Sequence, residues 1–242
     1  GLAMLYFSIY AATIIYQLIP LLPTAFTSMI LVTLTVASVA IQIDSLLLAI
    51  FAIVGGYATP LLLWVGHPNM VVLYSYVLLL GLGILGIAHY KQWRLLNYLA
   101  FVFNYLLLFI SLLDYQNSDV PLILTFLTLC FVLHSSLVYI YNIAKGEKTT
   151  LLEIGQLIVN AAIYTAVAYY LIETSYGKSY PALLSLSLAL FYAAHAYLFL
   201  KHRPIHRNLI ISLTALAGFY ITWTMPLVFE RESLTSSWSV QA

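Results

Sequence analysis

Residues 70–90 read MVVLYSYVLLLGLGILGIAHY, an apolar stretch without any Lys, Arg, Asp or Glu. A helix needs about 20 mainly apolar residues to cross the hydrocarbon layer of a bilayer, because each backbone polar group must be paired within the segment. Eight further stretches meet this requirement, so nine spans are predicted: 2–19, 23–43, 46–64, 70–90, 95–113, 120–143, 150–172, 181–200 and 208–229. The predicted fold class is all-α, a polytopic transmembrane helix bundle of about nine spans.

The composition supports a membrane location. Hydrophobic residues make up 63% of the 242 residues and charged residues only 7%, whereas soluble domains carry about 25% charged residues. The period-two alternation of a membrane β-barrel is absent. The net charge of +1 gives no attraction for nucleic acid, which we exclude as a partner. The only cysteine, Cys130, cannot form an internal disulfide.

The positions of the charged residues predict the orientation. Seven of the nine basic residues lie in or beside three links between spans: Lys91, Arg94, Lys145, Lys148, Lys201, Arg203 and Arg207. Cytoplasmic loops of bacterial membrane proteins collect Lys and Arg. The opposite links are mainly acidic: Asp114, Asp119, Glu173, Glu230 and Glu232. We therefore expect a bacterial inner membrane protein whose N-terminal end is cytoplasmic and whose C-terminal end, as far as residue 242, lies outside.

The basic links recur at intervals of 54 residues (Lys91 to Lys145) and 56 residues (Lys145 to Lys201). This spacing suggests stacked two-helix hairpins. Any polytopic chain with short loops gives a similar spacing, so a true internal duplication stays open. We expect residues 1–242 to form a single transmembrane domain.

Three segments carry a family resemblance: AIFAIVGGYATPLLLWVG at 49–66, LYSY at 73–76 and WRLLNYLAF at 93–101. They resemble the bacterial membrane-protein family known as domain of unknown function 2339, and the likeness covers essentially the whole chain. The Gly-Gly-x-x-Thr-Pro-x-Leu-Leu element is its most specific part. Trp64 and Val65 stand where relatives have a Ser-Thr pair, and Asn104 stands in place of a Thr. A ligand held by that polar pair in relatives would lack these partners here.

The resemblance brings no activity with it, because the family has none established. It implies a longer protein, since members usually have many more spans, often preceded by a coiled coil. We therefore expect residues 1–242 to be a portion of a longer multi-span chain that continues beyond Ala242 into another apolar segment.

Acidic residues inside a membrane are the usual candidates for function, because burying charge there is unfavourable. Here the acids have simpler interpretations. Thr150 and Glu153 have the spacing of a capping box. Asp44 with Ser45, and Asp119, are placed to accept backbone amides at helix starts. No acid remains for an ion-coupled pump, and no catalytic or zinc motif is present, so the sequence leans against an enzyme.

Pro60 interrupts the third predicted span, four residues after Gly56. Its ring collides with the Gly56 carbonyl and its nitrogen has no hydrogen to donate, so we expect a bend or break after the Gly55-Gly56 pair. We further expect the freed carbonyl to face protein or water. Broken helices often line transport sites, but they also occur as packing kinks.

Three polar residues in other spans are candidates for a substrate pathway together with Gly55, Gly56 and Pro60. These are Asn104, His134 and Asn160, which could converge on one pocket. The alternative is that their side chains join helices by hydrogen bonds worth about 0.6 to 2 kcal/mol each.

His134 and His195 are the weak metal candidates. Each lies fourteen residues past the first residue of its span, and both spans run in the same direction, so their depths match. Two imidazoles can hold a haem iron or another metal. Each ring can equally bond a neighbouring helix, and no cofactor is strongly implied.

Three functions therefore remain open. The leading interpretation is a non-enzymatic structural or accessory component of a membrane assembly, with the lipid bilayer and other membrane subunits as partners. The first alternative is a permease or flippase for an uncharged or amphiphilic substrate. The second is a haem- or metal-binding membrane protein.

Overall fold

A computed structural model describes residues 2–18, 22–63, 69–91, 93–145, 149–177, 180–202 and 207–228. Within these ranges the chain is almost wholly helical and has no strand. The helices are α1 (Leu2–Tyr10) with η1 (Ala11–Ile15), α2 (Leu22–Gln42), α3 (Leu46–Leu62), α4 (Met70–Lys91), α5 (Arg94–Ser111), η2 (Leu112–Asp114), η3 (Asn117–Asp119), α6 (Val120–Lys145), α7 (Leu151–Tyr176), α8 (Tyr180–His202) and α9 (Arg207–Val228). The all-α prediction is confirmed, and each predicted span coincides with one of the helices α1 to α9.

Some residues used in the sequence argument fall outside the described ranges. They are Trp64, Val65, Lys148, Arg203, Glu230 and Glu232.

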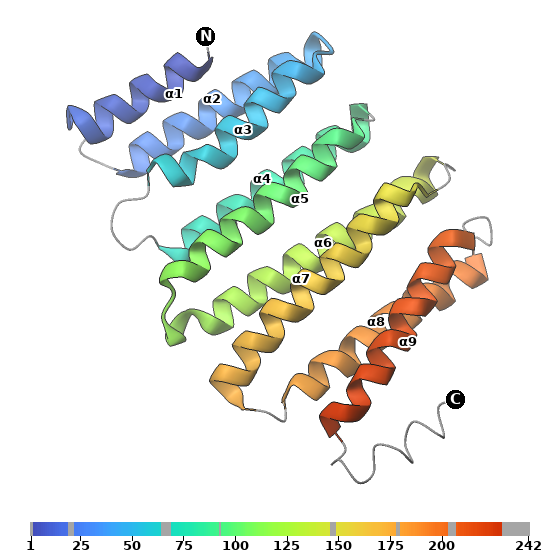
Figure 1. Cartoon of the computed structure of the whole chain (residues 1–242). Helices are drawn as coiled ribbons and strands as arrows, with labels where there is room; N and C mark the ends of the chain where they lie inside the picture. The colour runs from blue at the N-terminus through green and yellow to red at the C-terminus, as the bar shows by residue number, and fades with distance from the viewer. Residues whose placement is uncertain are drawn as a thin grey trace. The chain divides into compact units, whose positions relative to one another are not determined.

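The chain divides into two compact units, residues 1–122 and 123–242. In the first unit α2 pairs with α3 and α4 with α5, and α1 packs beside the first pair (Figure 1). In the second unit α6 pairs with α7 and α8 with α9 (Figure 1). Two-helix hairpins therefore follow one another within each unit, as the spacing of the basic links suggested.

Seven of the described helical segments are long and apolar enough to cross a membrane: Thr24–Gln42, Met70–Ile87, Arg94–Asp114, Asn117–Ser136, Leu151–Tyr176, Tyr180–Lys201 and Arg207–Val228. Met4–Ile15 and Leu46–Leu62 are apolar but shorter. Large apolar side chains such as Leu79, Leu183 and Phe219 are exposed on these helices. Apolar surface of this extent is typical of contact with lipid, so the molecule is an all-α membrane helix bundle.

Two of the expected capping carboxylates are confirmed. The Thr150 amide donates to Glu153 Oε2 at 2.8 Å, and the Glu153 amide donates to Thr150 Oγ1 at 3.3 Å. This is the predicted capping box of α7. Ahead of α6, the Gln116 amide donates to Asp119 Oδ2 at 3.0 Å. Both carboxylates therefore accept the backbone amides that a helix start leaves unpaired.

Asp44 forms an ion pair and does not cap a helix as predicted. Ser45 is the N-cap of α3 and accepts the Leu48 amide at 3.4 Å. Asp44 adopts a left-handed conformation with φ of 55°, and its Oδ1 atom lies 3.0 Å from Lys91 Nζ at the end of α4. The prediction of a helix-capping carboxylate is wrong here, because the side chain meets a lysine that is distant in sequence. The ion pair shows that the α2–α3 link and the end of α4 lie at the same end of the first unit.

Gly177 caps the C-terminal end of α7, and its substitution tests the backbone conformation at that position. Gly177 has φ of 104° and ψ of 172°, a region that essentially only glycine adopts, at about 1 to 3 kcal/mol for other residues. Gly177→Ala should lower the free energy of unfolding in detergent micelles by that amount. The control is Gly155→Ala inside α7, where a methyl group meets nothing within 4 Å; it should raise stability by up to about 1 kcal/mol. Equal effects of the two substitutions contradict the assignment.

Candidate functional site

A side chain of α4 replaces the hydrogen bond that Pro60 removes from α3. The helix runs as one α-helix from Leu46 to Leu62 with Pro60 inside it, so it is not broken, and the bend stays a prediction. The carbonyl that Pro60 deprives of an amide belongs to Gly56. It accepts a hydrogen bond from the Tyr76 hydroxyl at 2.6 Å. The prediction that this carbonyl faces protein is confirmed, and Pro60 itself is buried.

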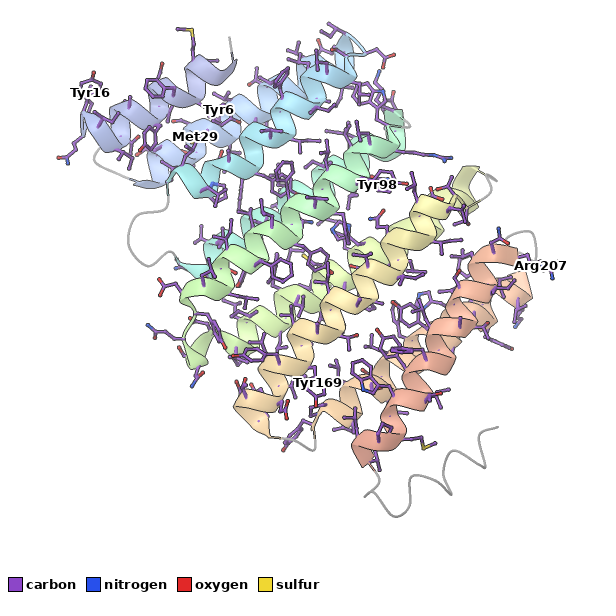
Figure 2. All side chains as sticks on the ribbon, in the orientation of Figure 1. Tyr6, Tyr16, Met29, Tyr98, Tyr169 and Arg207 are labelled. Atoms are coloured by element: carbon purple, nitrogen blue, oxygen red, sulfur yellow. The ribbon has the colours of Figure 1, made fainter. Side chains whose placement is uncertain are left out.

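The Gly55-Gly56 pair is a place of close helix approach. A Cβ atom on Gly55 would lie 2.6 Å from the Tyr6 ring, and one on Gly56 would lie 3.0 Å from Thr33 Cγ2. The absence of these methyl groups therefore lets α1 and α2 pack against α3. Figure 2 shows Tyr6 pointing from α1 toward Met29 on α2, and both belong to one buried cluster.

The hydroxyl groups at this crossing form a chain of hydrogen bonds that ends on backbone carbonyls. Thr33 donates to the Met29 carbonyl at 2.9 Å, so the Tyr6 hydroxyl, which is bonded to Thr33, acts as the donor to it. Thr59 donates to the Gly55 carbonyl at 3.1 Å. Each hydroxyl hydrogen at this buried crossing therefore has an acceptor.

Asn104 joins α3 to α5. Its Oδ1 atom accepts the Tyr57 hydroxyl at 2.6 Å, and the residue is only 1% exposed. A Cβ atom on Gly81 of α4 would lie 3.0 Å from Asn104 Nδ2, so glycine at position 81 makes room for the amide. The Tyr57 ring also stacks on Phe103, with 5.2 Å between ring centroids. Asn104 is thus packed among three helices.

Asn160 has the corresponding role between α6 and α7. Its Nδ2 group donates to the Phe131 carbonyl at 3.0 Å and to Ser135 Oγ at 2.9 Å. Asn160 is fully buried and His134, which precedes Ser135, is 1% exposed. The structure therefore brings Asn160 to the turn of α6 that carries His134.

The six pathway candidates thus form two groups. Gly55, Gly56, Pro60 and Asn104 belong to the first compact unit, and His134 and Asn160 belong to the second. Their convergence on a single pocket stays a prediction.

The two metal candidates lie on helices that contact each other. The Phe131 ring of α6 lies 5.2 Å from the Phe191 ring of α8, about one turn before His134 and His195 respectively. His195 Nδ1 lies 2.7 Å from the Phe191 carbonyl of its own helix. Among the described residues no group of three or more His, Cys, Asp and Glu side chains could hold a metal ion. A haem or metal held by the two histidines stays a prediction.

Sequence reasoning did not single out the buried tyrosines that bond to other helices. Tyr57 and Tyr76 donate to the groups described above. In the second unit Tyr220 is 2% exposed; its hydroxyl lies 2.7 Å from Thr165 Oγ1, and its carbonyl accepts Ser185 Oγ at 2.9 Å. Their positions well inside apolar runs were the available signal, because an interfacial tyrosine lies near a helix end.

The bond between Tyr76 and Gly56 can be tested by a double-mutant cycle with Pro60. Tyr76→Phe leaves the Gly56 carbonyl unpaired, and Pro60→Ala restores an amide to it. The free-energy loss caused by Tyr76→Phe in detergent micelles should be about 1 kcal/mol smaller in the Pro60→Ala background. Tyr74→Phe is the matched control, because the Tyr74 hydroxyl bonds Ser111 at 2.8 Å; its loss should add to that of Pro60→Ala. If the free-energy losses of Tyr76→Phe and Pro60→Ala also add, the hydrogen bond between Tyr76 and the Gly56 carbonyl is contradicted.

Comparison with known proteins places the chain in a family. No curated protein and no solved structure matches it. The family model described as predicted membrane protein (DUF2339) matches residues 1–242, which confirms the resemblance seen in the sequence, and no activity is established for that family. The chain belongs to the DUF2339 family of predicted membrane proteins.

Proposed function

We propose that this chain is a non-enzymatic structural or accessory component of an assembly in the bacterial inner membrane. The observation that carries the proposal is that three of the candidate pathway residues, Gly56, Asn104 and Asn160, bond to neighbouring helices. The Gly56 carbonyl accepts Tyr76, Asn104 accepts Tyr57, and Asn160 donates to Phe131 and Ser135. A polar group that binds a substrate must be accessible to it, whereas these groups already bond to other parts of the protein.

The energetics support the same interpretation. Interhelical hydrogen bonds in a membrane contribute about 0.6 to 2 kcal/mol each, so a set of them makes a firm bundle. The glycines beside these bonds add close packing, since Gly55, Gly56 and Gly81 each face a side chain of another helix. A bundle built in this way suits a component that holds its shape and binds other membrane subunits through its apolar surface.

A permease or flippase is the second candidate, and one observation favours it. Gly55 lines a cavity of about 790 Å³ between α1 and α3 together with Tyr6, Tyr10 and Ala58. That volume lies within the usual range for ligand pockets, about 300 to 1,000 Å³. Asn104 and Asn160 do not line this cavity, which is why we rank the candidate second.

Water access to the two asparagines separates these functions. In a Cys130→Ala background, Asn104→Cys and Asn160→Cys should not react with a membrane-impermeant maleimide in intact vesicles, whichever side the reagent is applied to. Both should react after denaturation in dodecyl sulfate. Asp114→Cys is the control, because Asp114 is exposed and should react without denaturation. Labelling of either buried cysteine in the folded protein contradicts the structural role and supports transport.

We also propose that residues 1–242 work as one transmembrane domain with the basic links in the cytoplasm, the N-terminal end inside and the C-terminal end outside. The excess of Lys and Arg in these links supports this orientation. The Asp44–Lys91 ion pair at one end of the first unit agrees with it.

Single-cysteine labelling tests the orientation. Lys91→Cys, Lys145→Cys and Lys201→Cys should be labelled only from the cytoplasmic side, and Asp114→Cys only from the other side. Labelling of Lys145→Cys and Asp114→Cys from the same side would overturn the orientation and the span count together.

A further inference from the structure

The first unit contains an apolar cavity of about 440 Å³ bounded mainly by α2, α3 and α4. Its walls are alkyl side chains and small residues, for example Ile30 and Ala37 of α2, Ile53 of α3, and Leu80 and Gly83 of α4. The Phe26 and Tyr76 rings both line it and contact each other across α2 and α4, with 4.8 Å between centroids. These two rings therefore close the space between the helices at that point.

The cavity opens onto the surface that faces lipid. Leu34 and Leu79 line it and are 56% and 73% exposed. They lie on Thr24–Gln42 and Met70–Ile87, two of the helical segments that can cross a membrane. The rim of the cavity is therefore continuous with the apolar surface that contacts the hydrocarbon layer.

Three side chains on the cavity wall carry hydroxyl groups, and two of them, Tyr76 and Thr33, bond to backbone carbonyls; the third, Ser75, is exposed. The Tyr76 hydroxyl donates to the Gly56 carbonyl, and the Thr33 hydroxyl donates to the Met29 carbonyl. Apolar cavities of this kind exclude water and take up apolar ligands. An empty space would also deprive the lining atoms of dispersion contacts. The chemistry of the wall therefore fits an alkyl chain and not a polar headgroup.

We infer that this cavity binds one acyl chain of a bilayer phospholipid as a resident part of the folded bundle. The chain enters between Leu34 and Leu79 and lies against Ile53 and Gly83, while its headgroup stays at the membrane interface. The bound lipid fills the space between α2 and α4 that side chains leave open. This inference does not rest on the proposed function, because a structural component and a permease can both hold such a lipid.

Two glycines of α4 make a matched test. A Cβ atom on either Gly83 or Gly86 would meet nothing within 4 Å, but Gly83 lines the cavity and Gly86 does not. Gly83→Trp should fill the cavity, whereas Gly86→Trp adds the same indole to the same helix away from it. The full chain is purified in mild detergent, incubated with phosphatidylethanolamine that carries two C16 acyl chains, and examined by native mass spectrometry.

The wild type and Gly86→Trp should each retain one phospholipid more than Gly83→Trp. Added phospholipid should raise the melting temperature of the first two proteins and leave that of Gly83→Trp unchanged. Equal lipid retention by all three proteins, or equal loss in both variants, would overturn the inference. If Gly83→Trp does not fold, Ala37→Phe fills the cavity from the opposite wall and should lose the same lipid.

Discussion

The structure depends on one constraint, the pairing of backbone polar groups inside hydrocarbon. An α-helix meets this constraint by itself except where a proline removes a donor. Pro60 creates that exception in α3, and the Tyr76 hydroxyl of α4 supplies the missing hydrogen bond to the Gly56 carbonyl. One side chain thus pairs the carbonyl that Pro60 leaves without an amide and attaches α3 to α4. The same tyrosine borders the apolar cavity, so the position of α4 is fixed beside the space that we assign to a lipid chain.

The same rule explains the other buried polar groups. Asn104, Asn160 and Tyr220 each connect two different helices. Such bonds need short distances between helices, and small residues provide them: Gly55, Gly56 and Gly81 each leave room for a side chain from another helix. For these polar residues and glycines the sequence left both a pathway and a packing role open, and in the structure they work together as packing elements. This is the basis for preferring a structural role to a transport role.

The sequence was sufficient for what depends on local pattern. Apolar runs of the right length located the helices α1 to α9, and the Thr150–Glu153 spacing located the start of α7. It was insufficient where a partner lies far along the chain. Nothing local indicates that Tyr76 bonds a carbonyl twenty residues earlier, or that Asp44 meets Lys91. The cavity was likewise beyond prediction, because it results from how three helices pack.

The central claim is that protein groups, and not water, satisfy the polar atoms within the membrane. The most direct measurement is an experimental structure of the full chain in lipid nanodiscs, at a resolution that shows side chains and ordered water. The account predicts the Tyr76 hydroxyl within hydrogen-bonding distance of the Gly56 carbonyl, with no water beside Gly56, Asn104 or Asn160. A Tyr76 side chain turned away from α3, with water reaching the Gly56 carbonyl from either face of the membrane, would contradict it.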